Sequence, residues 1–369
     1  MEKLILITCF EKIEDPRIER NKLYALPEIL LVAFATILAN GETYTDMRDF
    51  GIAKLDFFKT ILSFENGIPS ADTFERVFGM LNPKCLEDLL IDLTRLLTRN
   101  EACQSVALDG KTLRRSGSEN KRPLHIVSAW ASHNKLVLGC RAVEEKSNEI
   151  TAIPEILKLL DLKGVTVTSD AIGCQVAIAE QIVEQGGDFA LALKENHGNL
   201  HDDVEAFFQN VPATETDRVE RYETIEKDHG RIEKRQYGLY SDMAWLKELH
   251  PQWNVVQSIG YVLSTRIVKN KKTEELRYFV VSYKHNITRF AQNVRAHWGV
   301  ENSLHWFLDF TLHEDYSRVR DRNAATNLAI MRRLAVNKYT QDSTPKRSNR
   351  RKRLVAGWDD TYLKTLLFS

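Results

Sequence analysis

Cysteine is scarce in this sequence, and the few cysteines lack the spacings that would give them a structural role. The 369 residues include five cysteines, an odd number, and no two of them form a CxxC motif. This pattern argues against a disulfide framework and against a zinc module. It makes a reducing cytoplasm the expected location of the protein.

The chain also lacks a hydrophobic run long enough to cross a bilayer. Its longest apolar run, ILLVAFATILA, covers only residues 29–39, whereas a membrane-spanning helix needs about 20 residues. The first residues, MEKLILITCFEK, lack the basic start, the long apolar middle and the small-residue cleavage site of a secretory signal. We therefore expect no membrane partner.

An excess of charge of one sign is missing as well, since 51 Lys and Arg residues balance 51 Asp and Glu residues. The balance is uneven along the chain. Residues 317–353 contain 12 Lys or Arg residues and only two Asp, and the densest part reads PKRSNRRKR. This strip is either a solvated basic segment or a phosphate contact, because dense positive charge releases counterions from a polyanion. The second interpretation indicates a nucleic-acid partner.

The first hundred residues have the apolar spacing of helices. Pro27 is placed to begin one helix, and Ser70 is a candidate N-cap of another, whose buried face would include Phe74, Val77 and Phe78. Several short helices of this kind could form a DNA-binding bundle or a packing domain. The pattern favours neither.

After residue 101 the sequence becomes typical of strands. SVALDGK, PLHIVSAWASHN and KLVLGCRAVE predict three successive strands, and VTVTSDA and DFALALKEN predict two more, each preceded by a helical segment. A more polar stretch with alternating residues then suggests a β-rich insertion. The chain returns to helix at ITRFAQNVRAHWGVENSLHWFL. The sequence thus predicts an α/β fold with a mixed sheet flanked by helices.

Two aspartates end strongly apolar stretches of the predicted sheet, Asp109 in VALDGKTLRR and Asp170 in VTVTSDAIG. Taken alone, Asp109 could belong to a hairpin turn, because Asp-Gly is a strong turn signal, and Asp170 could cap the following helix. If both close neighbouring strands, they lie side by side at the carboxyl edge of the sheet, where ligand sites form. Adjacent carboxylates repel unless a cation lies between them, which indicates a divalent metal ion.

A third carboxylate interrupts an apolar stripe late in the chain. Apolar residues recur at three- and four-residue steps from Phe290 to Leu308, and Glu301 falls on the face that they share. A carboxylate on a buried face needs a partner, which could be a metal ion or an arginine. His297 and His305 lie one turn on either side, so HWGVENSLH could also form a His–Glu–His zinc face.

A series of ordered blocks, rather than one motif, relates the chain to a known family. The blocks are FENGIPSADTFERVF, ALDGKTLRRS, EKSNEITAIPEILKLLDLKG, TSDAIGCQVAIAEQI, GGDFALALKENHGNL and HWGVENSLHWFLDFTLHEDYSRVR. Together they resemble a DDE transposase of the H-repeat-associated insertion-sequence group. The resemblance implies an RNase H-like catalytic core in which Asp109, Asp170 and Glu301 are catalytic and hold two Mg²⁺ ions, for which Mn²⁺ can substitute. It also implies cleavage of double-stranded DNA at element ends and strand transfer into target DNA.

The resemblance also suggests which residues contact DNA. In the wider class the glutamate helix has an arginine four positions earlier and a lysine seven positions later, where this chain has His297 and Leu308. Arg295 and His305 are candidate replacements. The full set of candidate DNA contacts is Lys111, Arg114, Arg115, Lys194, Asn196, His229, Arg231, Arg295, His297 and His305. We expect Trp298 and Trp306 to be core residues rather than to stack on bases.

The chain is predicted to have five parts. Residues 1–100 form an N-terminal helical, candidate DNA-binding domain, 101–200 the first part of the RNase H-like core, 201–284 the β-rich insertion, 285–340 the core completion with the glutamate-bearing helix, and 341–369 a basic C-terminal tail. End recognition would involve the helical domain, the insertion and the tail. Pairing of two element ends suggests a homodimer, in a bacterial cytoplasm and nucleoid-associated when bound to DNA.

Two other functions stay open at this point. The chain could be an RNase H-like nuclease without strand transfer. It could also be a catalytically idle, DNA-binding relic of a transposase.

Overall fold

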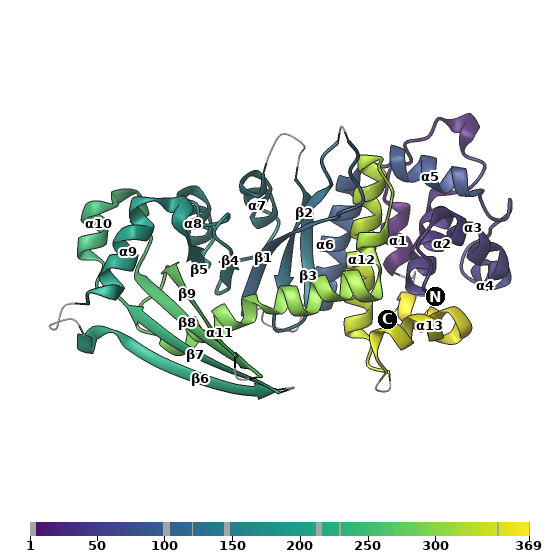
Figure 1. The fold of residues 1–369 in the computed structure, drawn as a ribbon. Helices are drawn as coiled ribbons and strands as arrows, with labels where there is room; N and C mark the ends of the chain where they lie inside the picture. The colour runs from purple at the N-terminus through teal and green to yellow at the C-terminus, as the bar shows by residue number, and fades with distance from the viewer. Residues whose placement is uncertain are drawn as a thin grey trace.

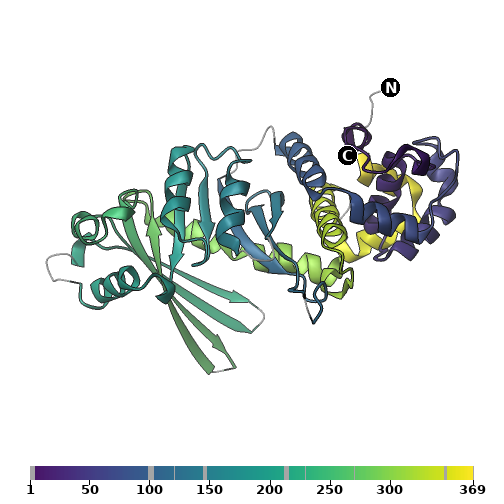
Figure 2. The same cartoon turned by 90° about the horizontal axis from the view of Figure 1, so that it is seen from above.

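The computed structural model describes residues 5–98, 104–119, 121–143, 148–211, 216–228, 230–269, 271–344 and 347–368. The molecule is elongated, with a helical part at one end, a mixed sheet in the middle and a long extension of that sheet at the other end (Figure 1). The view from above shows the same three-part arrangement (Figure 2). None of the helices in the described ranges combines the length and the apolar character needed to cross a bilayer.

Among the described residues, one nine-stranded sheet has the order β3-β2-β1-β4-β5-β9-β8-β7-β6. β1, β4 and β5 are parallel to one another, and the other neighbours are antiparallel. The five predicted core strands are all present, which confirms the α/β fold class. The strands are β1 (Ser105–Thr112), β2 (His125–Ala131), β3 (Leu136–Ala142), β4 (Thr166–Ser169), β5 (Asp188–Leu193), β6 (Glu220–Asp228), β7 (Arg231–Tyr240), β8 (Ser258–Val268) and β9 (Lys271–Val281).

The strands of the predicted insertion continue the core sheet rather than forming a sheet of their own. β9 pairs with the free edge of β5, with Ala190 opposite Val281, and β8, β7 and β6 follow outward. The same stretch contributes helices α9 (Asn199–Gln209) and α10 (Ala244–Leu249). The extension is therefore joined to the strands that carry the predicted carboxylates.

Helices cover both faces of the sheet. Side chains alternate along each strand, so apolar side chains point to both faces and need covering. Val106 and Leu108 of β1 pack with α7 and α8 on one face, and Ala107 packs with α6 and α12 on the other. The same alternation places Asp109 on the Ala107 face. α11 covers the adjoining part of the extension. These helices are α6 (Pro83–Thr98), α7 (Glu149–Leu157), α8 (Val176–Glu184), α11 (Ile287–His297) and α12 (Arg322–Gln341).

The N-terminal helices begin where the sequence predicted. Pro27 lies in the first turn of α2, and the Ser70 hydroxyl accepts the Thr73 N–H at the start of α5, which confirms the predicted N-cap. α2 is buried along nearly its whole length and contacts the first and last helices of the chain. The helices of this part are α1 (Ile5–Glu11), α2 (Leu26–Leu38), α3 (Tyr44–Ala53), α4 (Leu55–Lys59) and α5 (Ala71–Met80), with the short 3-10 helix Glu19–Asn21 between α1 and α2.

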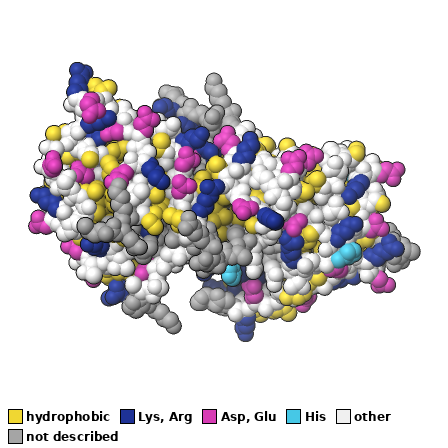
Figure 3. Space-filling view, turned by 180° about the vertical axis from the view of Figure 1, so that it is seen from behind, with side chains coloured by type: hydrophobic (Ala, Val, Ile, Leu, Met, Phe, Trp, Pro, Cys, Tyr) yellow, Lys and Arg dark blue, Asp and Glu magenta, His cyan; other side chains and the backbone are white. Residues whose placement is uncertain are grey.

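The basic strip of residues 317–353 is partly buried, so neither a solvated segment nor a phosphate contact describes all of its cations. The end of the strip lies in α13 (Asn349–Trp358), which is followed by α14 (Asp360–Phe368). Arg353 donates to the Ile37 carbonyl at 3.3 Å, so this cation holds α13 against α2. On the face seen in Figure 3, basic and acidic side chains are interspersed. The buried cations between residues 317 and 353 are Arg332, Arg333, Lys338, Lys352 and Arg353.

Candidate active site

Asp109 and Asp170 directly follow paired residues of two parallel strands. Leu108 of β1 lies opposite Ser169 of β4, so the next residue on each strand is an aspartate. Asp109 is not at a hairpin tip, because β1 continues to Thr112 in antiparallel pairing with β2. The two predicted carboxylates are therefore neighbours at the carboxyl end of the parallel pair.

These two carboxylates lie in surroundings that disfavour their negative charge. Burial, and then the charge of Asp170, raise the pKa of Asp109 to about 7, although the Gly110 N–H donates to it at 2.9 Å. Burial and the charge of Glu149 raise the pKa of Asp170. Two backbone N–H donors and the charge of Lys194 lower it, but the net shift is upward. A site whose carboxylate pKa values are raised in this way lacks positive charge, and a bound cation would supply it.

Glu149 is a fourth carboxylate of this region that the sequence analysis did not identify. Its Oε1 lies 2.6 Å from His125 Nε2, and a Cβ at Gly110 would come within 2.4 Å of that oxygen. Glu149 therefore packs on the opposite face of β1 from Asp109. In the sequence it directly follows Asn148, the N-cap of α7, where an acidic residue is ordinary, so no sequence signal marks it.

Glu301 is exposed, which corrects the prediction that it interrupts a buried apolar face. It lies on the π-helix η5 (Val300–His305), and a second π-helix, η6 (Phe307–Thr311), follows. Their i→i+5 hydrogen bonds wind the chain more loosely than an α-helix, so side chains depart from the α-helical pattern. Val300 is buried instead. The charge of Glu301 still contributes to the raised pKa of Asp109, so the two lie within electrostatic reach.

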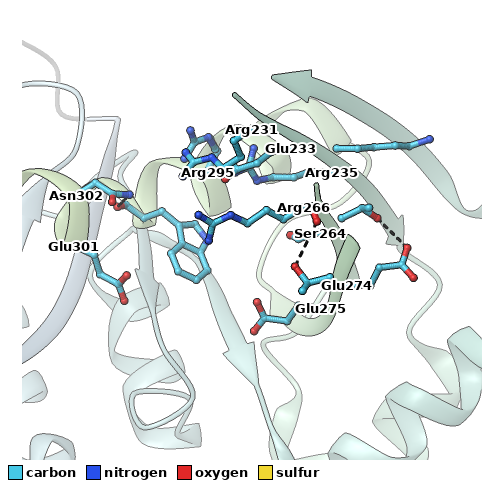
Figure 4. A pocket seen from close by; sticks show the side chains of 14 residues that line it. Arg231, Glu233, Arg235, Ser264, Arg266, Glu274, Glu275, Arg295, Glu301 and Asn302 are labelled. Carbon is cyan, nitrogen blue, oxygen red and sulfur yellow. Dashed lines mark hydrogen bonds and ion pairs between the residues drawn. The ribbon is translucent and has the colours of Figure 1, made fainter. Parts of the chain in front are cut away.

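Glu301 lines an open pocket of about 620 Å³ between the π-helical segment and the sheet extension (Figure 4). Two of the predicted DNA contacts, Arg231 and Arg295, line the same pocket. Arg231 Nε lies 2.8 Å from Glu233, and Arg295 NH2 lies 3.0 Å from Glu226. All four of these side chains keep some exposure to solvent. We call this site the open charge pocket.

Four other predicted contacts are exposed, and two of them lie near Asp170. Lys194 directly follows β5, and its charge acts to lower the pKa of Asp170. Asn196 donates to the backbone carbonyl of Ala171 at 3.3 Å. The Arg114 side chain is 83% exposed, and the Arg115 guanidinium lies over an exposed tyrosine ring. The remaining candidate, His229, lies outside the described residues.

Lys111 does not fit a phosphate-contacting role, because it is buried among carboxylates. Its Nζ lies 2.8 Å from Asp309, 2.9 Å from Asp315 and 3.8 Å from Glu314. Arg333 of α12 lies 2.9 Å from Glu314, and both of these side chains are fully buried. We call these five residues the buried charge network. It links β1 to the π-helical segment and to α12.

His297 and His305 do not fit a phosphate-contacting role either, since both are largely buried and neutral. Burial lowers the pKa of His297 to about 4, and its Nδ1 lies 3.0 Å from the Thr168 hydroxyl. Burial and the charge of Arg333 lower the pKa of His305 to about 3, and its Nδ1 lies 3.7 Å from Asp109 Oδ2. The two rings contact different strands, so they do not form the alternative zinc face.

The prediction that Trp306 belongs to the core is wrong. Its side chain is 52% exposed and stacks on Phe310, with ring centroids 5.3 Å apart. Trp298 is half-buried and lines the open charge pocket, where the Arg277 guanidinium lies 4.2 Å from its ring. The looser π-helical winding accounts for the outward position of Trp306.

The chemistry of the site fits a hard divalent cation, because its donors are carboxylates that repel one another. Lys194 is the one cation among the main influences on the pKa values of the two aspartates. Within the described ranges, no three Asp, Glu, His or Cys side chains already lie close enough to hold one ion. Among the described residues, the carboxylates are therefore neighbours without forming a preassembled ligand cluster.

Comparison with known proteins decides the family. Residues 7–94 match the family model described as DDE_Tnp_1-associated, and residues 101–338 match the transposase DDE domain. The chain belongs to the DDE transposase family. Membership of this family implies DNA as the partner and, in general, a dependence on divalent metal ions.

Relatives from Escherichia coli match almost the whole chain. The "H repeat-associated putative transposase YhhI" of strain K12 is 38% identical over 352 residues, 93% of this chain and 92% of YhhI. The "Putative transposase YncI" of strain O157:H7 is 34% identical over 369 residues, 99% of this chain and 94% of YncI. The "Inactive transposase YbfQ" of strain K12 is 43% identical over 54 residues, 15% of this chain and 64% of YbfQ. These similarities confirm the resemblance to the H-repeat-associated group.

Proposed function

We propose that this DDE transposase cleaves DNA at the ends of an insertion sequence and joins those ends to target DNA. The proposal rests chiefly on the parallel register of β1 and β4, in which Leu108 and Ser169 are opposite each other and each precedes an aspartate. The raised pKa of Asp109 supports it, because neighbouring carboxylates raise that pKa and a bound cation would lower it.

Asp109, Asp170 and Glu301 would hold two Mg²⁺ ions, for which Mn²⁺ can substitute. When bound, the ions supply positive charge that offsets the charge on both the attacking and the leaving oxygen of a phosphodiester. The neutral imidazole of His305 would orient the Asp109 carboxylate without adding charge. No covalent bond between protein and DNA is needed.

The exposed cations around the carboxylates would bind and orient the DNA strand. Lys194 would hold a phosphate beside Asp170, while Arg231 and Arg295 would hold phosphates along the open charge pocket beside Glu301. Phosphate contacts of this kind fix position rather than sequence, so recognition of the element end needs further base contacts.

Joining two element ends requires both ends in one complex. We propose that this complex is a homodimer on double-stranded DNA, and that the protein is nucleoid-associated in the bacterial cytoplasm when bound. Analytical ultracentrifugation with and without end DNA tests the dimer: a complex containing a single chain and two ends would contradict it.

Cleavage of candidate end DNA in Mg²⁺ or Mn²⁺ tests the proposed site. We expect Asp109→Asn, Asp170→Asn and Glu301→Gln each to lower the cleavage rate at least about a hundredfold, while DNA binding persists. Glu248→Gln, an exposed change on α10, is the matched control. Equal cleavage by wild type and all three site variants would exclude these carboxylates as the site.

Two observations keep other functions in view. The YbfQ relative is named inactive, and the described residues hold no preassembled ligand cluster. A labelled end DNA that is cut but never joined to target DNA would identify a nuclease. DNA binding without metal-dependent cleavage would identify a catalytically idle relic.

A further inference from the structure

Two consecutive arginines of α12 are both buried but differ in their partners. Arg333 donates to Glu314 at 2.9 Å, to the Ser128 hydroxyl at 3.0 Å and to the Ala329 carbonyl at 3.0 Å. Arg332 is only 3% exposed, yet its side chain forms no hydrogen bond and no ion pair within 4 Å to any described residue. A buried guanidinium without an acceptor is strongly unfavourable. Its side-chain nitrogens are not fully enclosed and border the adjoining pocket, so the acceptor that they need is water or a bound anion.

Arg332 lines a pocket of about 610 Å³ between the N-terminal helices and the core. The walls come from the start of α3, from α5, from residues 313–321 and from α12. The Tyr44 hydroxyl, in the same wall, is buried and likewise has no hydrogen-bond partner among the described residues. Arg332 acts on the pKa of Tyr44, so the two groups are near each other. The pocket thus contains two hydrogen-bond donors, the Arg332 guanidinium and the Tyr44 hydroxyl, that have no acceptor among the described residues.

The acidic residues of this pocket are mostly engaged elsewhere. Glu42 is bonded to His313, and Asp321 accepts the Ala324 N–H at the start of α12. Glu75 is exposed. The basic lining residues without an ion pair to the described protein are Arg318, Arg320 and Arg332. Outside the Glu42–His313 pair, the lining thus holds three arginines against Glu75 and Asp321, a small excess of positive charge that favours an anion.

We propose that this pocket binds a phosphate group of the DNA backbone, with Arg332 and Tyr44 as donors. A guanidinium forms two parallel hydrogen bonds with a phosphate, and this arrangement satisfies a buried arginine well. The charges of Glu314 and Glu42 favour the charged form of Arg332, but both carboxylates lie beyond ion-pair distance. They therefore offset its charge without accepting hydrogen bonds from it.

The pocket lies on the segment that also borders the candidate active site. In that segment His305 is beside Asp109, residues 309, 314 and 315 belong to the buried charge network, and residues 316–321 line the pocket. The same stretch of chain therefore borders both the carboxylates and the pocket of Arg332. The identity of the ligand as DNA rests on the proposed function, whereas the need for an anion does not.

Salt-dependent binding of a short DNA duplex, followed by fluorescence anisotropy, tests the proposal. Arg332→Gln is expected to weaken binding about ten- to a hundredfold and to lower the slope of log affinity against log salt by about one. Tyr44→Phe removes one hydroxyl and should have a smaller effect in the same direction. Arg20→Gln, an exposed change, is the control and should alter neither quantity.

Thermal unfolding without DNA separates ligand binding from a structural role. Because Arg332 has no described protein partner, Arg332→Gln should leave the Tm unchanged or raise it. A lowered Tm would show that Arg332 stabilises the fold through bridging water and would overturn the proposal. So would an unchanged duplex affinity and salt slope in Arg332→Gln.

Inorganic phosphate distinguishes the two sources of the anion. If phosphate raises the Tm of wild type but not of Arg332→Gln, while duplex binding is the same in both proteins, the pocket binds free phosphate and the assignment to DNA is overturned. The cleavage assay separates this result from the proposed function. Loss of cleavage in Asp109→Asn would uphold the catalytic site even if Arg332 contributes nothing to DNA binding.

Discussion

The buried charge network and the open charge pocket both adjoin the π-helical segment, and both consist of paired cations and carboxylates. In the network, Arg333 and Glu314 are 2.9 Å apart and fully buried. At the pocket, the lining residue Arg295 lies 3.0 Å from Glu226 beside it, with 43% and 45% of their side chains exposed. The contact distances are almost equal, so the two sites differ mainly in solvent exposure.

Solvent exposure decides what such a pair contributes. Breaking a buried pair leaves an uncompensated charge at a cost of about 3–5 kcal/mol, whereas an exposed pair contributes about 0–1 kcal/mol. We therefore expect the buried charge network to stabilise the fold and to fix the segment that carries Glu301. We expect DNA phosphates to displace the carboxylates from the arginines of the open charge pocket.

The largest expected effect is a loss of stability when the buried charge network is broken. Arg333→Met leaves Glu314 with only Lys111, 3.8 Å away, so we expect the free energy of unfolding to fall by about 3–5 kcal/mol. Urea denaturation measures this change. The double variant Arg333→Met/Glu314→Gln is the control and should recover part of the loss, because it removes both charges. A loss below about 1 kcal/mol, as expected for an exposed pair, would remove the distinction between the two sites.

A second buried pair, Glu87 and Arg141, tests the effect of burial through the pH dependence of stability. Glu87 is bonded to Arg141, yet burial outweighs that partner and raises the pKa of Glu87 from 4.5 to about 7. The folded protein therefore holds this proton to a higher pH than the unfolded protein does, so stability falls as pH rises from about 4.5 to about 7. Glu87→Gln should remove about 1–3 kcal/mol of that decline.

Urea denaturation of wild type and Glu87→Gln at several pH values between 4 and 8 measures the decline. Glu65→Gln, an exposed change, serves as the control. Parallel curves for wild type and Glu87→Gln across this range would show that Glu87 titrates normally, and that burial does not dominate at this pair.

The smallest expected effects are in the open charge pocket. Arg295→Gln should weaken duplex binding about two- to fivefold, because one phosphate contact is lost, and it should lower the salt slope by about one. Glu226→Gln should strengthen binding by a similar factor, since the competing carboxylate is removed. Both variants should unfold within about 0.5 kcal/mol of wild type. If both variants weakened binding, Glu226 would be supporting the arginine rather than competing for it.

Local signals predicted much of the fold. Pro27 and Ser70 begin helices because their effects depend on a few neighbouring residues. The strands that lead to Asp109 and Asp170 are recognisable from apolar, β-branched runs, but only the structure shows that they pair in parallel as neighbours. The position of Glu301 was mispredicted, because a period of 3.6 residues does not describe a π-helix.

The contacts of charged residues were the least predictable feature. Lys111 looked like a surface cation beside Asp109, but its partner Asp315 is 204 positions away in the chain. Glu149 looked like an ordinary residue of a helix N-terminus, but it packs against the strand position next to Asp109. In each case the partner comes from a distant element, and no local pattern encodes it.

The sequence by itself determined the family, the order of helices and strands, and which apolar runs carry the aspartates, since these depend on local pattern and on similarity to relatives. Only the tertiary structure decided which cations are buried and which face solvent. Burial arises when distant elements pack together, and Lys and Arg residues that look alike in the sequence then differ in how much water surrounds them. That difference separates Arg333, whose pair with Glu314 is fully buried, from Arg295, whose pair with Glu226 faces solvent.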